Sequence, residues 1–295
     1  MITRRTFLTG SALAAGEKAV AADPVWGSPV LDIHLHPRRE GAMELDHLQG
    51  SGVSKAVLLA GMAAEDRAKE LVAHYPDRFL RFTSTDVREE GAVARLGKSL
   101  QGGAIGLGEL KFPVEIDGSE MKRIYALAAE FQVPVLLHFE EGNFNSGIRR
   151  LPQVLQAFPK TTFIGHGQTW WAHIGTEVGN ETGYPVGKVR PGGLTDRVLA
   201  DYANIYGDFS ANSGRNALAR DPEFAAAFLV RHKRKLMFGC DCPCRDGRGD
   251  GQSSSVLQGK CIARETLTAL QRLAAPDLFR TIVWENGTKL LKISA

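Results

Sequence analysis

Short apolar segments rich in β-branched and aromatic residues alternate with amphipathic segments along nearly the whole chain. The apolar segments predict eight strands, at 30–36, 55–60, 79–85, 105–111, 133–139, 162–167, 205–210 and 236–241. Between them, apolar residues spaced three and four apart predict helices, for example over 65–74, 120–131, 194–202 and 222–231. Such alternation is typical of a parallel sheet with crossover helices, and eight repeats favour a closed (β/α)8 barrel over an open sheet.

Two long segments without a regular pattern follow the sixth and the eighth predicted strands, at 168–193 and 243–255. Loops of this length in a compact domain are usually lids or binding loops, and both would lie over the same face of the barrel. The segment 277–292 predicts a closing helix. No glycine-rich phosphate loop follows the first strand, which argues against a doubly wound nucleotide-binding fold.

The composition is that of a folded enzyme rather than of a disordered chain. Of 295 residues, 43% are hydrophobic and 23% charged, so we expect one barrel domain over 23–295. The net charge is only +3, and no run of Lys and Arg would follow a phosphate backbone, so nucleic acid is not an expected partner. Beyond the N-terminus, no stretch approaches the roughly 20 apolar residues of a membrane span. The expected partner is a small-molecule substrate, and an oligomer is compatible with the sequence.

The first 22 residues differ from the rest of the chain. Arg4 and Arg5 precede a short apolar run, and Ala19 to Ala21 have the small-x-small form of a cleavage site. This resembles a twin-arginine export signal over 1–22, which would make the mature protein periplasmic or secreted. Glu17 and Lys18 interrupt the apolar run, so a basic N-terminus on a cytoplasmic protein is the alternative.

The four cysteines raise the question of a disulfide or a metal. Cys240, Cys242 and Cys244 alternate near the end of the last predicted strand, and Cys261 stands apart. In an oxidising compartment, Cys261 could pair with Cys242 or Cys244. The C-x-C-x-C spacing is tighter than that of usual zinc cysteines and no second knuckle follows, so the sequence argues against structural zinc.

Four histidines and an aspartate stand at or near the C-terminal ends of predicted strands, where barrel enzymes assemble their sites. They are His34 and His36 on the first strand, His138 on the fifth, His166 on the sixth and Asp241 on the eighth. One residue separates His34 from His36, so both side chains point to the same face and can hold one ion. Such groups inside an apolar barrel are costly unless they are paired or bound to metal. A divalent metal accounts for all five.

These residues occur in the motifs LDIHLHP, VLLHFE, FIGHGQ and MFGCDCP, and the chain closes with VWENGTKLL. The set resembles the amidohydrolase superfamily, in its amidohydrolase-related branch, from about residue 30 to 291. The resemblance implies a metal-dependent hydrolase in which His34, His36, His138 and Asp241 ligate metal. It gives His166 the role of a ligand to a second ion or of a proton-handling group. Cys240 departs from the family pattern, which more often has Ser before the aspartate.

The chemistry of the site agrees with this resemblance. An ion with an open coordination position lowers the pKa of its bound water to about 7. Asp241 could contact the ion and also take the proton of the water. Imidazole and carboxylate ligands suit zinc, with manganese or iron as alternatives.

Glu109 raises the question of one ion or two. Its segment GLGELKF resembles the strand-four GE motif of TatD-type hydrolases, in which the glutamate bridges two ions. The alternative is that Glu109 pairs with Lys111, which lies two residues away on the same face. Lys111 itself would either contact substrate or neutralise the glutamate.

Several other residues are candidates for the substrate pocket. Trp170, Trp171 and His173 follow His166 in the long loop, where the tryptophans could exclude water, stack on a flat ligand or simply pack the loop. Asn212 and Arg215 follow the seventh strand and could reach a substrate oxygen or carboxylate. The remaining histidines fall in helical or surface patterns and are expected to be solvated or packed; they are His47, His74 and His232.

The sequence thus favours a hydrolase that uses a metal-activated water on a lactone, ester or amide. Three alternatives stay open: a metal-dependent decarboxylase of an unsaturated or aromatic acid, a TatD-like phosphodiesterase, and a non-catalytic metal-binding barrel. Carbon dioxide release, a steep salt dependence on DNA, or the absence of turnover would distinguish them.

Overall fold

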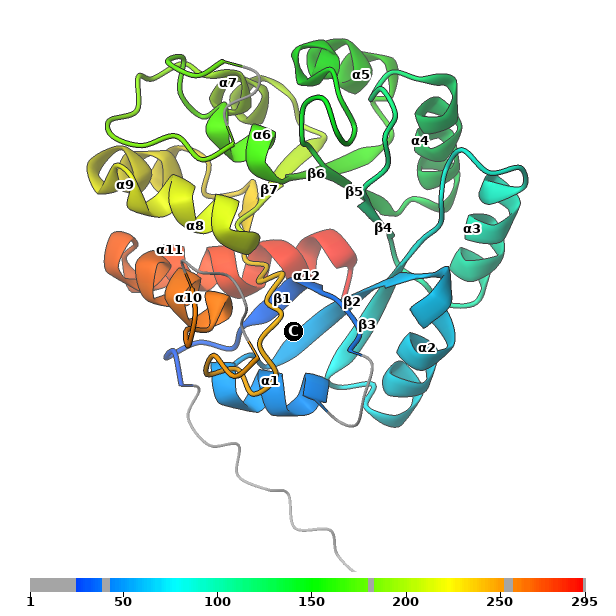
Figure 1. Ribbon diagram of the computed structural model, residues 1–295, viewed down its shortest axis with the longest axis horizontal. Coiled ribbons are helices and arrows are strands. Elements are labelled where there is room, and N and C mark those ends of the chain that lie inside the picture. Colours follow the sequence, from blue (N-terminus) through cyan, green and yellow to red (C-terminus); the bar gives the residue numbers. More distant parts are fainter. Residues whose placement is uncertain (1–24, 39–42, 180–182, 252–256, 294–295) are drawn as a thin grey trace, which may run out of the picture.

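The computed structural model describes residues 25–38, 43–179, 183–251 and 257–293. Eight parallel strands follow one another around a ring in sequence order, as Figure 1 shows. Their bounds are β1 Leu31–Leu35, β2 Lys55–Gly61, β3 Phe79–Ser84, β4 Leu107–Leu110, β5 Pro134–His138, β6 Thr162–His166, β7 Ile205–Asp208 and β8 Leu236–Met237. The predicted (β/α)8 barrel is confirmed. The predicted export signal over 1–22 lies outside the described residues.

The ring closes between β8 and β1 through the residues that follow β8. The Ile33 amide donates to the Phe238 carbonyl over 3.1 Å, and the Asp241 amide donates to the His34 carbonyl over 2.7 Å. The Cys240 amide donates instead to the buried Asp32 carboxylate over 2.9 Å. Because these bonds replace regular pairing, β8 is shorter than predicted and Asp241 lies beyond its end.

Helices surround the ring (Figure 1). Their bounds are α1 Met43–Ser51, α2 Glu65–His74, α3 Ala92–Gln101, α4 Ser119–Phe131, α5 Leu151–Ala157, α6 Gln168–Ala172, α7 Leu194–Asp201, α8 Ala211–Ala219, α9 Pro222–Arg231, α10 Ile262–Leu273, α11 Pro276–Arg280 and α12 Asn286–Leu291. Short helical turns cover Met62–Ala64, Ile148–Arg150 and Thr281–Glu285. The predicted irregular segment after β6 therefore begins with a helix, α6. No helix within the described ranges is both long and apolar enough to cross a bilayer.

Apolar side chains fill the interior of the barrel below the polar end. Leu31, Ile33, Phe82 and Ile164 belong to this interior cluster, which Leu291 of α12 joins. α12 packs closely on β1, since a Cβ on Gly287 would lie 2.9 Å from the Leu31 side chain. The helix predicted over 277–292 is present as α11, a turn and α12. One end of the barrel is thus closed by apolar packing, and the other is left for polar groups.

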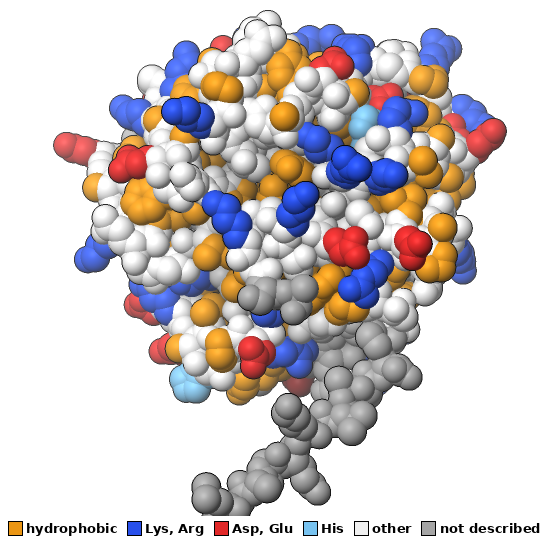
Figure 2. Space-filling model, turned by 180° about the vertical axis from the view of Figure 1, so that it is seen from behind, with side chains coloured by type: hydrophobic (Ala, Val, Ile, Leu, Met, Phe, Trp, Pro, Cys, Tyr) orange, Lys and Arg blue, Asp and Glu red, His pale blue; other side chains and the backbone are white. Residues whose placement is uncertain are grey.

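One face of the molecule shows how charged side chains are distributed on it. On the face drawn in Figure 2, Lys and Arg side chains are interspersed with hydrophobic, acidic and uncharged ones. This agrees with the small net charge of +3.

Candidate metal centre

His34 lies fully buried on β1, and only one of its two ring nitrogens has a hydrogen-bond partner among the described residues. Its Nδ1 is 2.7 Å from Asp208 Oδ2 and 3.0 Å from Ser210 Oγ. Its Nε2 has no hydrogen-bond partner, although Glu109 Oε2 and Asp241 Oδ1 each lie 3.9 Å away. A carboxylate on one nitrogen of an imidazole is the usual arrangement when the other nitrogen ligates metal.

His36 follows β1 and lies at the opening of the site. Its Nδ1 is 3.2 Å from the Leu59 carbonyl, and its side chain is 45% exposed. Its Nε2 lies 3.4 Å from Glu109 Oε2 and 3.5 Å from Asp241 Oδ1. The two histidines of the H-x-H motif therefore face the same two carboxylates, as their spacing predicts.

His138 and His166 end the neighbouring strands β5 and β6, where they are paired in register. Nδ1 of His138 is 2.7 Å from Glu109 Oε1, and its Nε2 is 3.3 Å from Glu140 Oε2. The fully buried His166 places Nδ1 2.6 Å from Ser210 Oγ. Its Nε2 has no hydrogen-bond partner and lies 3.6 Å from Glu109 Oε1. One ring nitrogen of each histidine therefore lies close to the same oxygen of Glu109.

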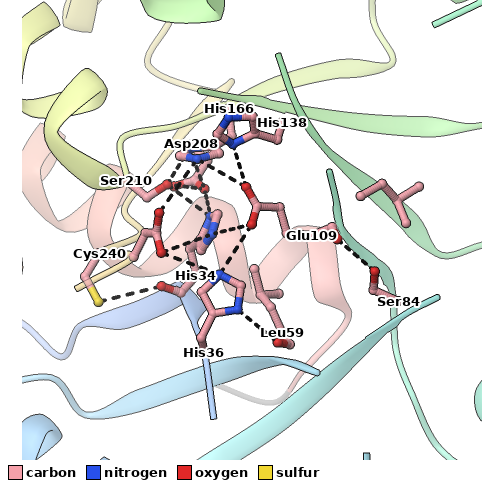
Figure 3. Close-up of polar contacts among 12 residues, drawn as sticks. His34, His36, Leu59, Ser84, Glu109, His138, His166, Asp208, Ser210 and Cys240 are labelled. Atoms are coloured by element: carbon pink, nitrogen blue, oxygen red, sulfur yellow. Dashed lines mark hydrogen bonds and ion pairs between the residues drawn. The ribbon is translucent and has the colours of Figure 1, made fainter. Parts of the chain in front are cut away.

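Glu109 stands between the two pairs of imidazoles, as Figure 3 shows. One carboxylate oxygen faces His138 and His166, and the other faces His34 and His36. Among the described ion pairs there is none between Glu109 and Lys111, whose Nζ lies instead 5.3 Å from the centre of the Phe144 ring. A carboxylate with one oxygen toward each pair has the position of a bridging ligand.

Asp241 adopts a backbone conformation that is uncommon for residues other than glycine. Its φ of 45° lies in the left-handed region. The side chain is 30% exposed and lies 4.0 Å or less from His34, His36 and His166. Unusual backbone conformations of this kind occur at functional sites, where the surrounding contacts maintain them.

The predicted metal ligands thus come together in three overlapping groups. They are His34, His36 and Glu109; Glu109, His138 and His166; and His34, His166 and Asp241, with the ligand atoms of each group within 4.8 Å of one another. Nitrogen and carboxylate oxygen donors fit a divalent ion such as zinc or manganese. The buried Nε2 atoms of His34 and His166, which have no other partner, fit a ligand role.

Charge pairing dominates the electrostatics of the site. Burial alone lowers the pKa of His34, but the carboxylates of Asp208, Asp241 and Glu109 raise it to about 10. Burial of the Glu109 carboxylate raises its pKa. Hydrogen bonds to His138 and His36 outweigh this effect and hold the pKa well below its usual value. The carboxylates therefore form an anionic cage that attracts either protons or a metal cation, and metal binding would displace protons from the histidines.

Two cavities open on either side of His36. One of about 680 Å³ is also lined by Ser84, Glu109 and Lys111. The other, of about 540 Å³, is lined by Asp241 and by the cationic Arg38 and Arg245. Both volumes suit a small organic molecule. The ligand cluster is therefore buried at its base and accessible at His36 and Asp241.

Of the residues predicted to bind substrate, only Lys111 lines one of these two cavities. Lys111 lines the larger cavity. Trp170 and Trp171 are almost completely buried, and Trp171 stacks on Phe209 with ring centres 4.3 Å apart. Their rings offer no face to a ligand, so the geometry favours the packing interpretation.

The other three pocket candidates do not line either cavity. His173 is buried, with Nδ1 2.8 Å from the Thr169 carbonyl. Arg215 places Nε 3.9 Å from Glu265 Oε2 on α10. The Asn212 side-chain oxygen is buried without a partner.

Asp208 and Ser210 belong to the site but were not among the predicted residues. Asp208 is fully buried at the end of β7, and Ser210 Oγ connects it to His34 and His166. Their spacing of two residues at the end of an apolar strand is the same signal that identified His34 and His36. The buried Asp32 was missed as well; it accepts a hydrogen bond from the His34 amide, and burial raises its pKa to about 7.

The expected pairing of Cys261 is not formed. All four cysteines are free and buried. The sulfurs of Cys242 and Cys261 lie 3.8 Å apart, beyond the S–S bond length of about 2.0 Å. Of the histidines expected to be solvated or packed, His47 and His232 are buried and His74 is exposed.

Solved structures with the same fold come from several bacteria. They include an uncharacterised TIM-barrel protein from Bordetella bronchiseptica, with 15% identity, a TM-score of 0.61 and coverage of 90% of this chain and 98% of that one. A probable 2-pyrone-4,6-dicarboxylic acid hydrolase from Acinetobacter baumannii has 14% identity, a TM-score of 0.58 and coverage of 90% and 99%. The 5-carboxyvanillate decarboxylase of Novosphingobium aromaticivorans, complexed with manganese and 4-hydroxy-3-methoxy-5-nitrobenzoic acid, has 12% identity, a TM-score of 0.59 and coverage of 91% and 97%.

At 12 to 15% identity, the similarity to these structures shows a shared fold and nothing more. No curated protein matches the chain significantly. A family model described as amidohydrolase matches residues 32–293, a range that runs from β1 through α12 and includes every ligand candidate of the barrel. The chain belongs to the amidohydrolase family.

Proposed function

We propose that this protein is a metal-dependent hydrolase that cleaves a small-molecule lactone, ester or amide. The observation that carries the proposal is the position of Glu109, with one oxygen toward each pair of imidazoles, next to cavities of about 680 and 540 Å³. The proposed ligands are His34, His36, Glu109, His138, His166 and Asp241. Family membership and the manganese-containing fold relative support a metal of this class, with zinc as our first choice.

A bound divalent ion would supply Lewis acidity and lower the pKa of water to about 7. Asp241 is the proposed proton acceptor, because its carboxylate is partly exposed beside the smaller cavity while its backbone is fixed by the bond to His34. Asp208 orients the His34 ring from the buried side. Lys111, Arg38 and Arg245 line the cavities and would attract an anionic group of the substrate.

The test of the shared ligand is the metal content of Glu109→Gln, measured by elemental analysis of protein purified without chelator. The substitution removes the charge that would serve both ions, so the content should fall by one ion per chain and hydrolysis across a lactone, ester and amide panel should be lost. Glu89→Gln is the matched control, because Glu89 lines the same cavity and forms an ion pair with Arg95. An unchanged metal content in Glu109→Gln would refute the bridging role.

Decarboxylation is the second candidate, and the fold relatives favour it. The manganese-bound decarboxylase and a 2,6-dihydroxybenzoate decarboxylase from Rhizobium share this fold. Incubating the metal-loaded protein with hydroxylated aromatic acids and measuring carbon dioxide would decide between the two reactions. Release of carbon dioxide without any lactone, ester or amide hydrolysis would replace our first proposal with this one.

The phosphodiesterase and non-catalytic alternatives are tested by the same preparation. DNA cleavage that declines steeply with salt would support a TatD-like activity. Normal metal content without turnover on any panel would support a metal-binding barrel. Export by the segment 1–22 is a separate proposal, which cell fractionation and the mass of the mature protein would test.

A further inference from the structure

A second group of potential metal ligands lies outside the barrel centre. Cys242 and Cys244 follow Asp241, Cys261 immediately precedes α10, and His47 lies in α1. In Figure 1 the segment after β8 runs between α1 and α10. All four side chains are almost completely buried, with at most 5% exposure. Three sulfurs and an imidazole from three parts of the chain thus share one enclosed space.

The distances among these atoms suit a tetrahedral ion. The Sγ atoms of Cys242 and Cys244 are 3.2 Å apart, those of Cys242 and Cys261 are 3.8 Å apart, and Nδ1 of His47 is 3.5 Å from Cys244 Sγ. The four ligand atoms all lie within 4.8 Å of one another. With zinc–sulfur bonds of about 2.3 Å, tetrahedral ligands lie roughly 3.8 Å from one another. The cysteines are free, so no disulfide accounts for the arrangement.

Hydrogen-bond donors and a positive charge lie beside the sulfurs of this cluster. Backbone amides donate to the sulfurs, that of Cys244 to Cys242 and that of Gly249 to Cys244. The Arg38 guanidinium donates to the carbonyls of Cys242 and Cys244 over 2.9 and 2.6 Å, which places a positive charge beside the cluster. Burial, with a contribution from Arg38, lowers the pKa of His47 to about 4, so the ring is neutral at pH 7.

We propose that Cys242, Cys244, Cys261 and His47 form a second metal site, a structural one for a thiophilic divalent ion such as zinc. Nδ1 of His47 is the ligand atom, because it lies 3.5 Å from Cys244 Sγ. It also lies 3.0 Å from the Cys244 carbonyl, a hydrogen bond that metal binding replaces. Nε2 faces the sulfur of Cys240 at 3.7 Å, an outer contact that orients the ring. The ion displaces the thiol protons, so the site holds three thiolates and one neutral imidazole.

This proposal departs from the expectation that the cysteine spacing gave. The C-x-C pair is tighter than usual zinc pairs, but residues two apart in extended chain point to the same side, so both sulfurs can reach one ion. The remaining ligands come from the start of α10 and from α1, which sequence spacing does not reveal. The ion joins the segment that carries Asp241 to two helices and so fixes that segment at the mouth of the barrel.

Cobalt substitution tests the site in the full-length protein. Thiolate ligands give cobalt an intense charge-transfer absorption in the near ultraviolet, whereas the nitrogen and oxygen donors of the barrel centre do not. We expect this band in the wild-type protein, its loss in Cys261→Ser and its retention in Glu109→Gln. The band therefore reports the cysteine site independently of the proposed hydrolase centre.

Elemental analysis provides the second measurement. Cys261→Ser should lose one zinc per chain, while Lys260→Ala, the control at the neighbouring exposed position, keeps it. If Cys261→Ser does not fold, the wild-type cobalt spectrum still decides the question. Absence of the near-ultraviolet band in folded wild-type protein would overturn the proposal. A mass two hydrogens below that of the reduced chain, which indicates a disulfide, would overturn it too.

Discussion

We expect Asp208 to act on the proposed metal centre through His34 rather than by direct contact with metal. Its carboxylate is 2.7 Å from Nδ1 of His34 and faces away from the cavities. Asp208→Asn keeps the shape but removes the charge that fixes this ring. Loss of such a partner typically lowers metal affinity about 10- to 100-fold, and we expect that loss in a chelator competition assay.

The control for this prediction is Asp77→Asn, since Asp77 is exposed. Wild-type affinity in Asp208→Asn would mean that hydrogen bonding, without charge, is sufficient to orient His34. The two variants should be compared at equal folded fraction.

Trp171 provides a test of packing against substrate binding. It stacks on Phe209, and its indole donates to the Asp208 carbonyl over 2.9 Å. We expect Trp171→Ala to lower the free energy of unfolding by about 3 to 5 kcal/mol in urea denaturation, because a large buried ring is removed. Trp171→Phe should lose less, and Val230→Ala, at an exposed position, should change stability little. A substrate contact would instead raise KM at unchanged stability.

At this scale the sequence identified the ligand candidates better than their partners. His34, His36, His138, His166 and Asp241 stand out because polar groups on apolar strands require compensation. Asp208 and Ser210 carry the same signal, but what they contact depends on how β7 lies beside β6 and on the turn after β8. The role of the tryptophans also needed coordinates, because an aromatic ring packs equally well on protein or on a ligand.

Among the elements, α7 and α9 are joined by a charge cluster in which Asp196 and His232 are buried and Arg231 is exposed. Asp196 of α7 lies 2.6 Å from Nε2 of His232 and 3.0 Å from Arg231, at the end of α9. Burial raises the pKa of Asp196, but the hydrogen bond to His232 and the charge of Arg231 outweigh this and lower it. A carboxyl whose folded pKa is depressed stabilises the protein above its unfolded pKa, near 4. That contribution is lost as the pH falls through the lower, folded value.

Asp196→Asn should therefore be less stable than wild type at pH 7, and the difference in the free energy of unfolding should shrink as the pH falls below about 4. Urea denaturation of both proteins between pH 7 and pH 3 measures this difference. Asp201→Asn, at an exposed position of the same helix, is the control. A difference that does not change with pH would mean that the shape of the side chain, and not its charge, matters here.

The strand boundaries lie within two residues of the predicted ones except at the last strand. The predicted strand 236–241 is apolar almost throughout, yet β8 contains only Leu236–Met237. Beyond it, the Cys240 amide bonds to Asp32 and Asp241 turns into a left-handed conformation. An apolar pattern reports burial, and burial does not require a hydrogen-bonded ladder.

For the whole molecule, bound metal should raise the free energy of unfolding. A ligand that binds only the folded state at 1,000 times its Kd adds about 4 kcal/mol. We expect chelator to lower the melting temperature and added zinc to restore it. In Cys261→Ser, the change in melting temperature on adding zinc should come from the barrel centre alone. In Glu109→Gln, most of that change should come from the cysteine site. No shift in any of the three proteins would contradict both metal proposals.

The sequence by itself determined the barrel and the end at which the polar groups gather. The period of apolar positions sets strands and helices, and parallel strands place their C-terminal ends on one face. Tertiary structure decided the rest: the position of Glu109 between two pairs of imidazoles, the support of Asp208 and Ser210, and the meeting of His47 with three cysteines. Those contacts join residues far apart in the chain, and only the closure of the ring and the packing of α1 and α10 bring them within bonding distance.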